Sequence, residues 1–189
     1  LLPLVLVPAM GIGELTPTAS SYANPIIFLF LGGFLLGIGM QRWNLHRRIA
    51  LLTLRAVGDQ PKRQVAGFML ATAFLSMWVS NTATAIMMMP IGLAIILEME
   101  KDFGEGETHA FAVGVMLGIG YACSIGGIAT LVGTPPNLSL ARIFEITFPD
   151  APPLVFGQWM VMALPISIVL LVTAWLLITR VFFRVPEHV

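Results

Sequence analysis

The sequence predicts an all-α polytopic membrane protein, in which transmembrane helices accompany one re-entrant helical hairpin and one discontinuous helix. Of the 189 residues, 57% are hydrophobic and 11% are charged. Soluble domains usually carry about 25% charged residues, more than twice this share. Long stretches contain no charged residue, and two of these stretches are interrupted by polar or proline-rich segments. The formal net charge is zero, so no nucleic-acid partner is expected.

The first region, residues 1–63, is expected to hold scaffold-type helices and a basic interfacial helix. It starts with the apolar segment LLPLVLVPAM, as though cut inside a span, which suggests a piece of a longer protein. The segment NPIIFLFLGGFLLGIGM then suits a transmembrane helix, which needs about 20 apolar residues. After it, Leu45, Ile49 and Leu52 recur at helical spacing among arginines. This pattern is typical of an amphipathic helix in the membrane interface, and a positive-inside anchor is favoured over a specific lipid site.

Residues 64–97 carry no charged side chain, and their number is too large for one span and too small for two. They predict a re-entrant hairpin with two arms of about 16 residues, each about 24 Å long. Such arms are shorter than the hydrocarbon core of about 30 Å. The tip then falls at Ser80-Asn81-Thr82. Non-helical backbone at that depth must be buried in protein or line a wet cavity.

Residues 110–147 predict the discontinuous helix. The segment GGIATLVGTPPN interrupts an uncharged run, and a helix cannot pass straight through Pro135 and Pro136, which lack backbone N–H groups. The hairpin and the broken helix together form a predicted transport-type unit, residues 64–147. The remaining region, residues 148–189, is predicted to be one final transmembrane helix.

The distribution of basic residues supports this topology. A hairpin returns to the side that it left, so the segments before and after it share one compartment. Nine of the ten Lys and Arg residues then face that compartment, and only Arg142 faces the other. Because cytoplasmic loops carry an excess of Lys and Arg, this side is expected to be cytoplasmic. The sequence therefore predicts a multi-pass protein of the cytoplasmic (inner) membrane.

The chemistry of the two interruptions favours transport over catalysis. Neither uncharged run contains an acidic, basic or histidine side chain, so a serine or threonine nucleophile lacks a base and no catalytic residue is expected. Neutral oxygens suit Na⁺, and two helix N-termini with unused N–H groups suit an anion, as in secondary transporters. One alternative is a non-transporting membrane scaffold subunit whose hydroxyls only cap and join helices. Another is a related anion carrier with a different substrate or with proton coupling.

The order of SNT and GGIATLVGTPPN resembles the N-terminal repeat of the divalent anion:sodium symporter family, which includes bacterial dicarboxylate, citrate and sulfate carriers. The segment YANPIIFLFLGGFLLGIGMQRWNLHRRIAL is similar to the helix and interfacial helix before the family's first hairpin. The resemblance implies two inverted repeats, a homodimer in the full-length protein and elevator-like motion. A second SNT and a second broken helix are absent from this sequence, so it corresponds to a truncated half.

The resemblance also implies the function and the site residues. The implied function is sodium-coupled symport of a di- or tricarboxylate, or of sulfate, with one Na⁺ site and part of the anion site in this chain. The implied Na⁺ ligands are Ser76, Ser80, Asn81 and the carbonyl oxygen of Gly133, with Asn137 as a further candidate. The implied substrate-binding residues are Ser80, Asn81, Thr82, Thr134 and Pro135.

Overall fold

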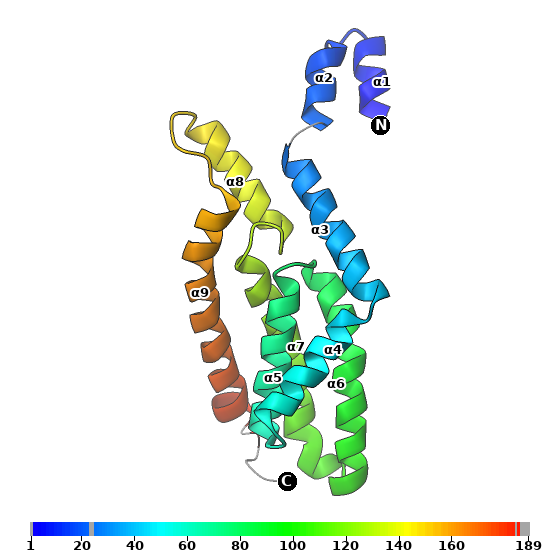
Figure 1. Cartoon of the computed structure of the whole chain (residues 1–189), viewed down its shortest axis with the longest axis vertical. Coiled ribbons are helices and arrows are strands. Elements are labelled where there is room, and N and C mark those ends of the chain that lie inside the picture. The colour runs from blue at the N-terminus through cyan, green and yellow to red at the C-terminus, as the bar shows by residue number, and fades with distance from the viewer. Residues whose placement is uncertain (1, 23–24, 184, 186–189) are drawn as a thin grey trace.

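The computed structural model describes residues 2–22, 25–183 and 185, and Figure 1 shows their arrangement. This described part contains helices and no strand, which confirms the all-α class. The helices are α1 (Leu2–Ala9), α2 (Leu15–Tyr22), α3 (Pro25–Arg42), α4 (Leu45–Val57), α5 (Pro61–Ser76), α6 (Asn81–Phe103), α7 (Glu105–Ile128), α8 (Pro135–Thr147), α9 (Phe156–Leu176) and the π-helix η1 (Leu177–Phe182).

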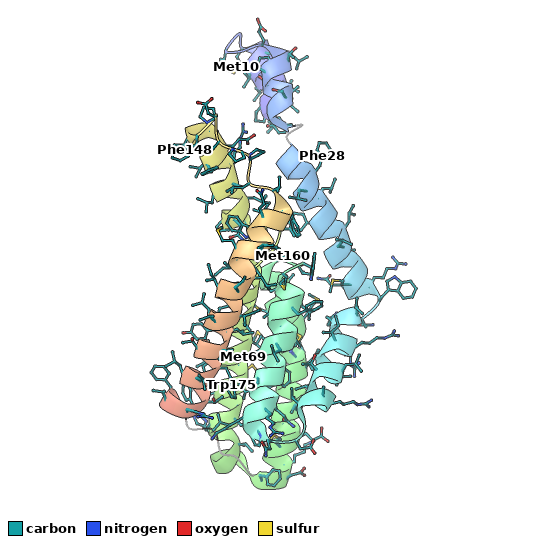
Figure 2. The ribbon with its side chains drawn as sticks, turned by 60° about the vertical axis from the view of Figure 1, so that its left-hand side comes forward. Met10, Phe28, Met69, Phe148, Met160 and Trp175 are labelled. Atoms are coloured by element: carbon teal, nitrogen blue, oxygen red, sulfur yellow. The ribbon has the colours of Figure 1, made fainter. Side chains whose placement is uncertain are left out.

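The core lies between α5, α6 and α7, which run side by side, with α4 lying across them and α9 alongside (Figure 1). The side chains of Phe68 on α5 and Phe111 on α7 are fully buried there. Burying a side chain of this size contributes about 1.5–3 kcal/mol relative to exposure. Met69, also buried, is labelled within this bundle in Figure 2. The helices around the interruptions are therefore anchored on a packed apolar core.

Near their C-terminal ends, α5 and α7 lie so close together that their backbones are almost in contact. A Cβ atom on Gly126 would lie only 2.2 Å from the carbonyl oxygen of Ala73. No larger residue fits there without moving one helix away from the other. Small residues permit such close helix contacts inside membranes, and here the contact brings the two interrupted segments together.

Several predicted helices are present. The segment predicted to be the first full span forms α3, and the basic segment after it forms α4. Among the residues that the structure describes, three helical segments are long and apolar enough to cross a membrane: Asn81–Phe103, Thr108–Ile128 and Phe156–Phe182. The last of these lies within the predicted final region. The chain also stops being helical between Ile128 and Pro135, as the predicted interruption requires.

The expectation of two equal hairpin arms was wrong. The first arm, α5, has 16 residues, but the second, α6, has 23. The expected end at residue 97 relied on the first charged residue, Glu98, yet Glu and Lys are good helix formers. The helix ends instead at Phe103 and is followed by Gly104, whose φ of 85° is one that glycine adopts readily. At about 1.5 Å per residue, α6 is about 35 Å long, so the re-entrant path stays a prediction.

Helix α9 is attached to the bundle by two tryptophans. Near its start, Trp159 Nε1 donates to the carbonyl oxygen of Ile128 at 3.0 Å. Near its end, Trp175 Nε1 donates to the carbonyl oxygen of Lys62, also at 3.0 Å; Figure 2 shows Trp175 at the lower end of α9. The start of α5, the end of α6 and the end of α9 therefore lie at the same end of the molecule (Figure 1).

Replacing Gly126 with alanine tests the contact between α5 and α7. The added methyl group must displace the backbone of Ala73, so Gly126→Ala should lower the melting temperature of the purified protein, by overpacking worth about 1–3 kcal/mol. Gly120→Ala is the matched control on the same helix, because nothing lies within 4 Å of its Cβ position. This control should melt at or above the original temperature, since alanine favours helices by up to about 1 kcal/mol over glycine. Equal melting temperatures for the two variants would contradict the contact.

Candidate functional site

The candidate site lies where two interruptions of the helices meet. One is the tip segment, residues 77–80, between α5 and α6; the other is the break segment, residues 129–134, between α7 and α8. A Cβ atom on Gly133 would lie 2.9 Å from the carbonyl oxygen of Ser76. Residues from two distant parts of the sequence therefore touch through their backbones.

Ser76 and Asn81 face each other across the tip segment. Ser76 is the last residue of α5 and is fully buried, and its Oγ donates to the carbonyl oxygen of Cys123 at 2.7 Å. Asn81 is the first residue of α6. The inner atom of its amide lies 2.8 Å from Ser76 Oγ, 3.1 Å from the Cys123 oxygen and 3.3 Å from the Gly133 oxygen. Three oxygens thus surround one end of one side chain.

This arrangement has two chemically consistent states. If the amide nitrogen of Asn81 points inward, its two N–H groups have three acceptors within reach, the oxygens of Ser76, Cys123 and Gly133. If the amide oxygen points inward, it faces two carbonyl oxygens that cannot donate a hydrogen bond, and their partial charges repel it. A cation among these oxygens removes that repulsion. The donor set is made only of neutral oxygens, which fits Na⁺ held by unwound backbone and polar side chains.

Two glycines make room for this cluster of oxygens. A Cβ atom on Gly127 would lie 2.3 Å from Asn81 Oδ1. A Cβ atom on Gly133 would lie 2.5 Å from the carbonyl oxygen of Gly127. Glycine is the residue that allows backbone to approach this closely. The glycines of GGIATLVGTPPN therefore have a steric purpose at this site.

The structure brings Ser76, Asn81 and Gly133 into contact and places the other predicted site residues at helix starts. Ser80 is the N-cap of α6, and its Oγ accepts a long hydrogen bond from the backbone N–H of Ala83, at 3.4 Å. Thr82 is exposed in the first turn of α6. The remaining two form the start of α8, with Thr134 as its half-buried N-cap and Pro135 as its exposed first residue.

The start of α8 differs from the expectation for an anion site. Its first two residues, Pro135 and Pro136, carry no backbone N–H. The N–H of Asn137 bonds to the carbonyl oxygen of Thr134 at 3.2 Å, and the N–H of Gly133 bonds to Thr130 Oγ1 at 3.1 Å. The dipole of α8 still points its positive end at the site. These positions at the start of α8 therefore offer no free backbone donor to an anion.

Sequence reasoning missed the residues that hold the break segment in shape. The fully buried Thr130 bonds through its hydroxyl to the tip segment, and Trp159 bonds to the end of α7. The amide nitrogen of Asn137 donates to the carbonyl oxygens of Gly127 at 2.9 Å and Thr130 at 2.7 Å. Its role as a Na⁺ ligand through the amide oxygen stays a prediction. The one available signal for Thr130 was its position between the glycines and the prolines.

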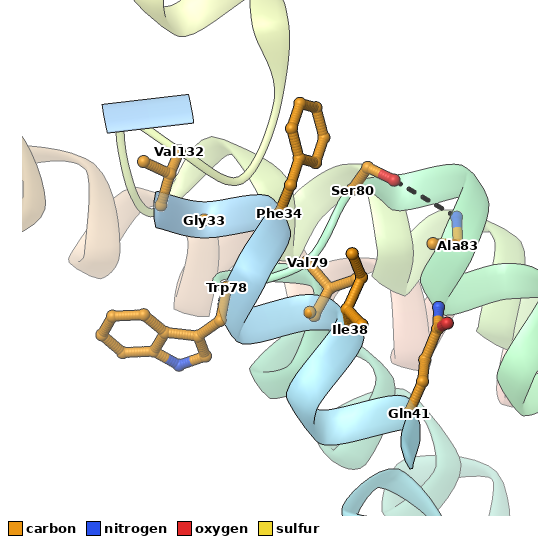
Figure 3. Close-up of a pocket in the computed structure, with 10 residues that line it drawn as sticks. Gly33, Phe34, Ile38, Gln41, Trp78, Val79, Ser80, Ala83 and Val132 are labelled. Atoms are coloured by element: carbon orange, nitrogen blue, oxygen red, sulfur yellow. Dashed lines mark hydrogen bonds between the residues drawn. The ribbon is translucent and has the colours of Figure 1, made fainter. Parts of the chain in front are cut away.

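A cavity of about 200 Å³ is lined by residues of α3 and of the two interruptions. Figure 3 shows its lining, which includes Gly33 on α3, Val79 and Ser80 of the tip segment and Val132 of the break segment. A Cβ atom on Gly37 would lie 3.4 Å from Val79, so α3 comes close to the tip segment at this glycine. The cavity walls are mainly apolar, which is the wrong chemistry for an anion.

Comparison with known proteins agrees with this chemistry. The family model for citrate transporters, CitMHS, matches residues 1–188. The sodium-dependent dicarboxylate transporter SdcS of Staphylococcus saprophyticus is 44% identical over 189 residues, and SdcS of Staphylococcus aureus is 46% identical over 188. Each alignment covers 97% of this chain and 36% of the relative. The chain therefore spans about a third of the length of these curated relatives.

These matches confirm the resemblance to anion carriers. The family and the relatives are transporters and not enzymes, as the absence of a base beside the polar segments predicted. The match of this chain to a bacterial transporter family, together with several long apolar helices, indicates a multi-pass protein of the cytoplasmic membrane. With a family model that covers residues 1–188, the chain belongs to the CitMHS citrate transporter family.

Proposed function

We propose that this chain is one half of an inverted-repeat secondary transporter for sodium-coupled symport of a di- or tricarboxylate, or of sulfate, across the cytoplasmic membrane. The observation that carries the proposal is the convergence of Ser76, Asn81 and Gly133 at the two interruptions. The sodium-dependent dicarboxylate transporters among the relatives support both the ion and the substrate class. The chain then supplies one Na⁺ site and part of the anion site.

The proposed Na⁺ ligands are the side chains of Ser76, Ser80 and Asn81 and the carbonyl oxygen of Gly133. Support comes from the distances between the inner amide atom of Asn81 and the oxygens of Ser76 and Gly133, 2.8 and 3.3 Å. Ser80 adjoins Asn81 and is half-buried at the start of α6. The oxygens carry no formal charge, so a bound Na⁺ leaves one net positive charge at the site. That charge favours an anion nearby.

The proposed anion site lies on the outer side of the same residues. Asn81 and Thr82 hold a carboxylate at the start of α6, where the helix dipole is equivalent to about half a positive charge. Ser80, Thr134 and Pro135 line this side. Thr82 and Pro135 are exposed. This exposure is expected if a further segment of the carrier packs against them and completes the site. The missing part of the site is assigned to a second repeat of the whole carrier.

Asn81 links the two parts of the site. Its amide has one oxygen that accepts and one nitrogen that donates. When the oxygen faces Na⁺, the nitrogen points away from the ion toward the anion. Without Na⁺, the nitrogen satisfies the inward oxygens of Cys123 and Gly133 and is lost to the anion. Binding of Na⁺ therefore prepares the anion site, which is how one side chain couples the two solutes. The resemblance further implies a homodimeric carrier, and this stays a prediction.

Substitution of Asn81 tests the proposed function directly. Asn81→Asp keeps the size and an oxygen but replaces the donor with a negative charge beside the anion. Two like unit charges about 4 Å apart repel by about 4 kcal/mol at an effective dielectric constant of 20. In the complete carrier, Asn81→Asp should abolish uptake of radiolabelled dicarboxylate while membrane expression stays normal. Uptake equal to that of the unmodified carrier would show that the tip segment is not the anion site.

Thr82→Ala, measured in the same uptake assay, should give a graded effect. Loss of one hydroxyl hydrogen bond, worth about 0.5–1.5 kcal/mol, should raise the half-saturating anion concentration about 2- to 12-fold. Thr53→Ala is the matched control, because the Thr53 hydroxyl donates within α4 to the carbonyl oxygen of Ile49 at 2.8 Å. A Thr82→Ala carrier with the same half-saturating concentration as the control would remove Thr82 from the site.

Gly127→Ala tests whether the Asn81 side chain needs the space that the missing side chain of Gly127 leaves beside α7. The added methyl group meets the flexible side chain of Asn81, at 2.3 Å, rather than the backbone of another helix. We expect sodium-dependent uptake to be lost, while the melting temperature falls less than in Gly126→Ala. Gly120→Ala should transport normally. If Gly127→Ala keeps uptake at the level of Gly120→Ala, the position of the Asn81 amide is not important for transport.

Labelling of single cysteines tests the re-entrant path. The start of α5 and the end of α6 lie at the same end of the bundle (Figure 1). In a complete carrier with Cys123→Ser, cysteines introduced as Lys62→Cys and Phe103→Cys should both react with a membrane-impermeant maleimide from the cytoplasmic side only. Reaction from opposite sides would mean that the tip segment lies inside a full span.

A further inference from the structure

Thr130 joins the two interruptions of the helices through a single hydroxyl group. Its Oγ1 donates to the carbonyl oxygen of Met77 at 2.5 Å and accepts from the backbone N–H of Gly133 at 3.1 Å. Met77 belongs to the tip segment and Gly133 to the break segment. The residue is fully buried. We propose that Thr130 is a positioning residue that sets the sodium-ligating carbonyl of Gly133, an inference that rests on the proposed function.

Both groups that Thr130 contacts lack a partner within their own helices. Met77 follows directly after α5, where the last carbonyl groups of a helix have no intrahelical donor. Gly133 lies in the break segment, outside α7 and α8. A hydroxyl is the smallest side-chain group that both donates and accepts. One threonine therefore satisfies a carbonyl of the first interruption and an N–H of the second at the same time.

The position of Gly133 determines where its carbonyl oxygen points. Glycine is the residue with the greatest backbone freedom, so Gly133 needs an external anchor to hold one orientation. The hydrogen bond from its N–H to Thr130 provides that anchor on one side of its Cα atom. Asn137 holds Thr130 in turn, because its Nδ2 donates to the Thr130 carbonyl oxygen at 2.7 Å. The Gly133 oxygen is then kept 3.3 Å from the inner amide atom of Asn81.

The experiment measures sodium dependence in the complete carrier, reconstituted in proteoliposomes. Thr130→Val has nearly the same shape but no hydroxyl, so it loses both hydrogen bonds. We expect the sodium concentration for half-maximal uptake to rise about tenfold, as losing hydrogen bonds of ordinary strength predicts. The anion concentration for half-maximal uptake, measured at saturating sodium, should stay unchanged. Thr130→Ser keeps the hydroxyl and should restore the original sodium curve.

Thr173→Val is the matched control. Thr173 lies on α9, is exposed, and donates only within its own helix, to the carbonyl oxygen of Val169 at 2.8 Å. Its substitution should leave the sodium curve unchanged. A second measurement that does not depend on transport is the rise in melting temperature when choline is replaced by Na⁺ in detergent. That rise should be reduced in Thr130→Val and retained in Thr130→Ser and Thr173→Val.

Ser76→Ala separates failure of this inference from failure of the proposed function. If Ser76→Ala raises the sodium requirement and Thr130→Val does not, Thr130 is not a positioning residue, although the Na⁺ site stands. If neither variant changes it, both the site and the inference are wrong. An equal loss of sodium response in Thr130→Val and Thr130→Ser would also overturn the role of the hydroxyl. Should Thr130→Val fail to reach the membrane, Thr130→Ala removes the same bonds from a smaller side chain and must show the same shift.

Discussion

Backbone groups freed by an interrupted helix must find partners inside the protein, because the surrounding lipid provides none. In this chain, each interruption is satisfied by groups from elsewhere in the fold. The Met77 carbonyl accepts a hydrogen bond from the Thr130 hydroxyl, and the Ile128 carbonyl accepts one from the indole of Trp159 on α9. Asn137, on the far side of the break segment, satisfies the Gly127 carbonyl. The contact between the interruptions therefore stabilises both of them. The candidate site is built from the backbone oxygens near Asn81 that take no part in these bonds.

The candidate site contains a group of oxygens whose partial negative charges repel one another. The carbonyl oxygens of Cys123 and Gly133 both face the Asn81 side chain, and neither can donate a hydrogen bond. An aspartate at position 81 would add a full negative charge to this repulsion, and a serine is too short to span the same distance. An amide is tolerated because it offers either N–H groups or an oxygen. The polarity of the site thus follows from the backbone geometry that the close helix contact imposes.

The sequence predicted the helical class and both interruptions, because prolines, glycines and uncharged runs have strong local consequences. The grouping of Ser76, Asn81 and Gly133 was implied only by the family resemblance. The sequence did not predict the role of Thr130, since one threonine in a polar segment looks the same whether it faces solvent or another backbone. The Cys123 carbonyl was also missed, because any residue carries a carbonyl. The length of α6 was missed because a change in charge was used as a helix end, although charged residues continue helices well.

The two tryptophans of α9 have a mechanical consequence. Their hydrogen bonds fasten α9 near its start to the end of α7 and near its end to the start of α5. Two hydrogen bonds far apart along one helix oppose both rotation and sliding of α9 against α5 and α7. We therefore expect α9 to move together with α5 and α7, despite its separate place in the chain. By contrast, α3 meets the tip segment where Gly37 lies against Val79, beside a cavity of about 200 Å³.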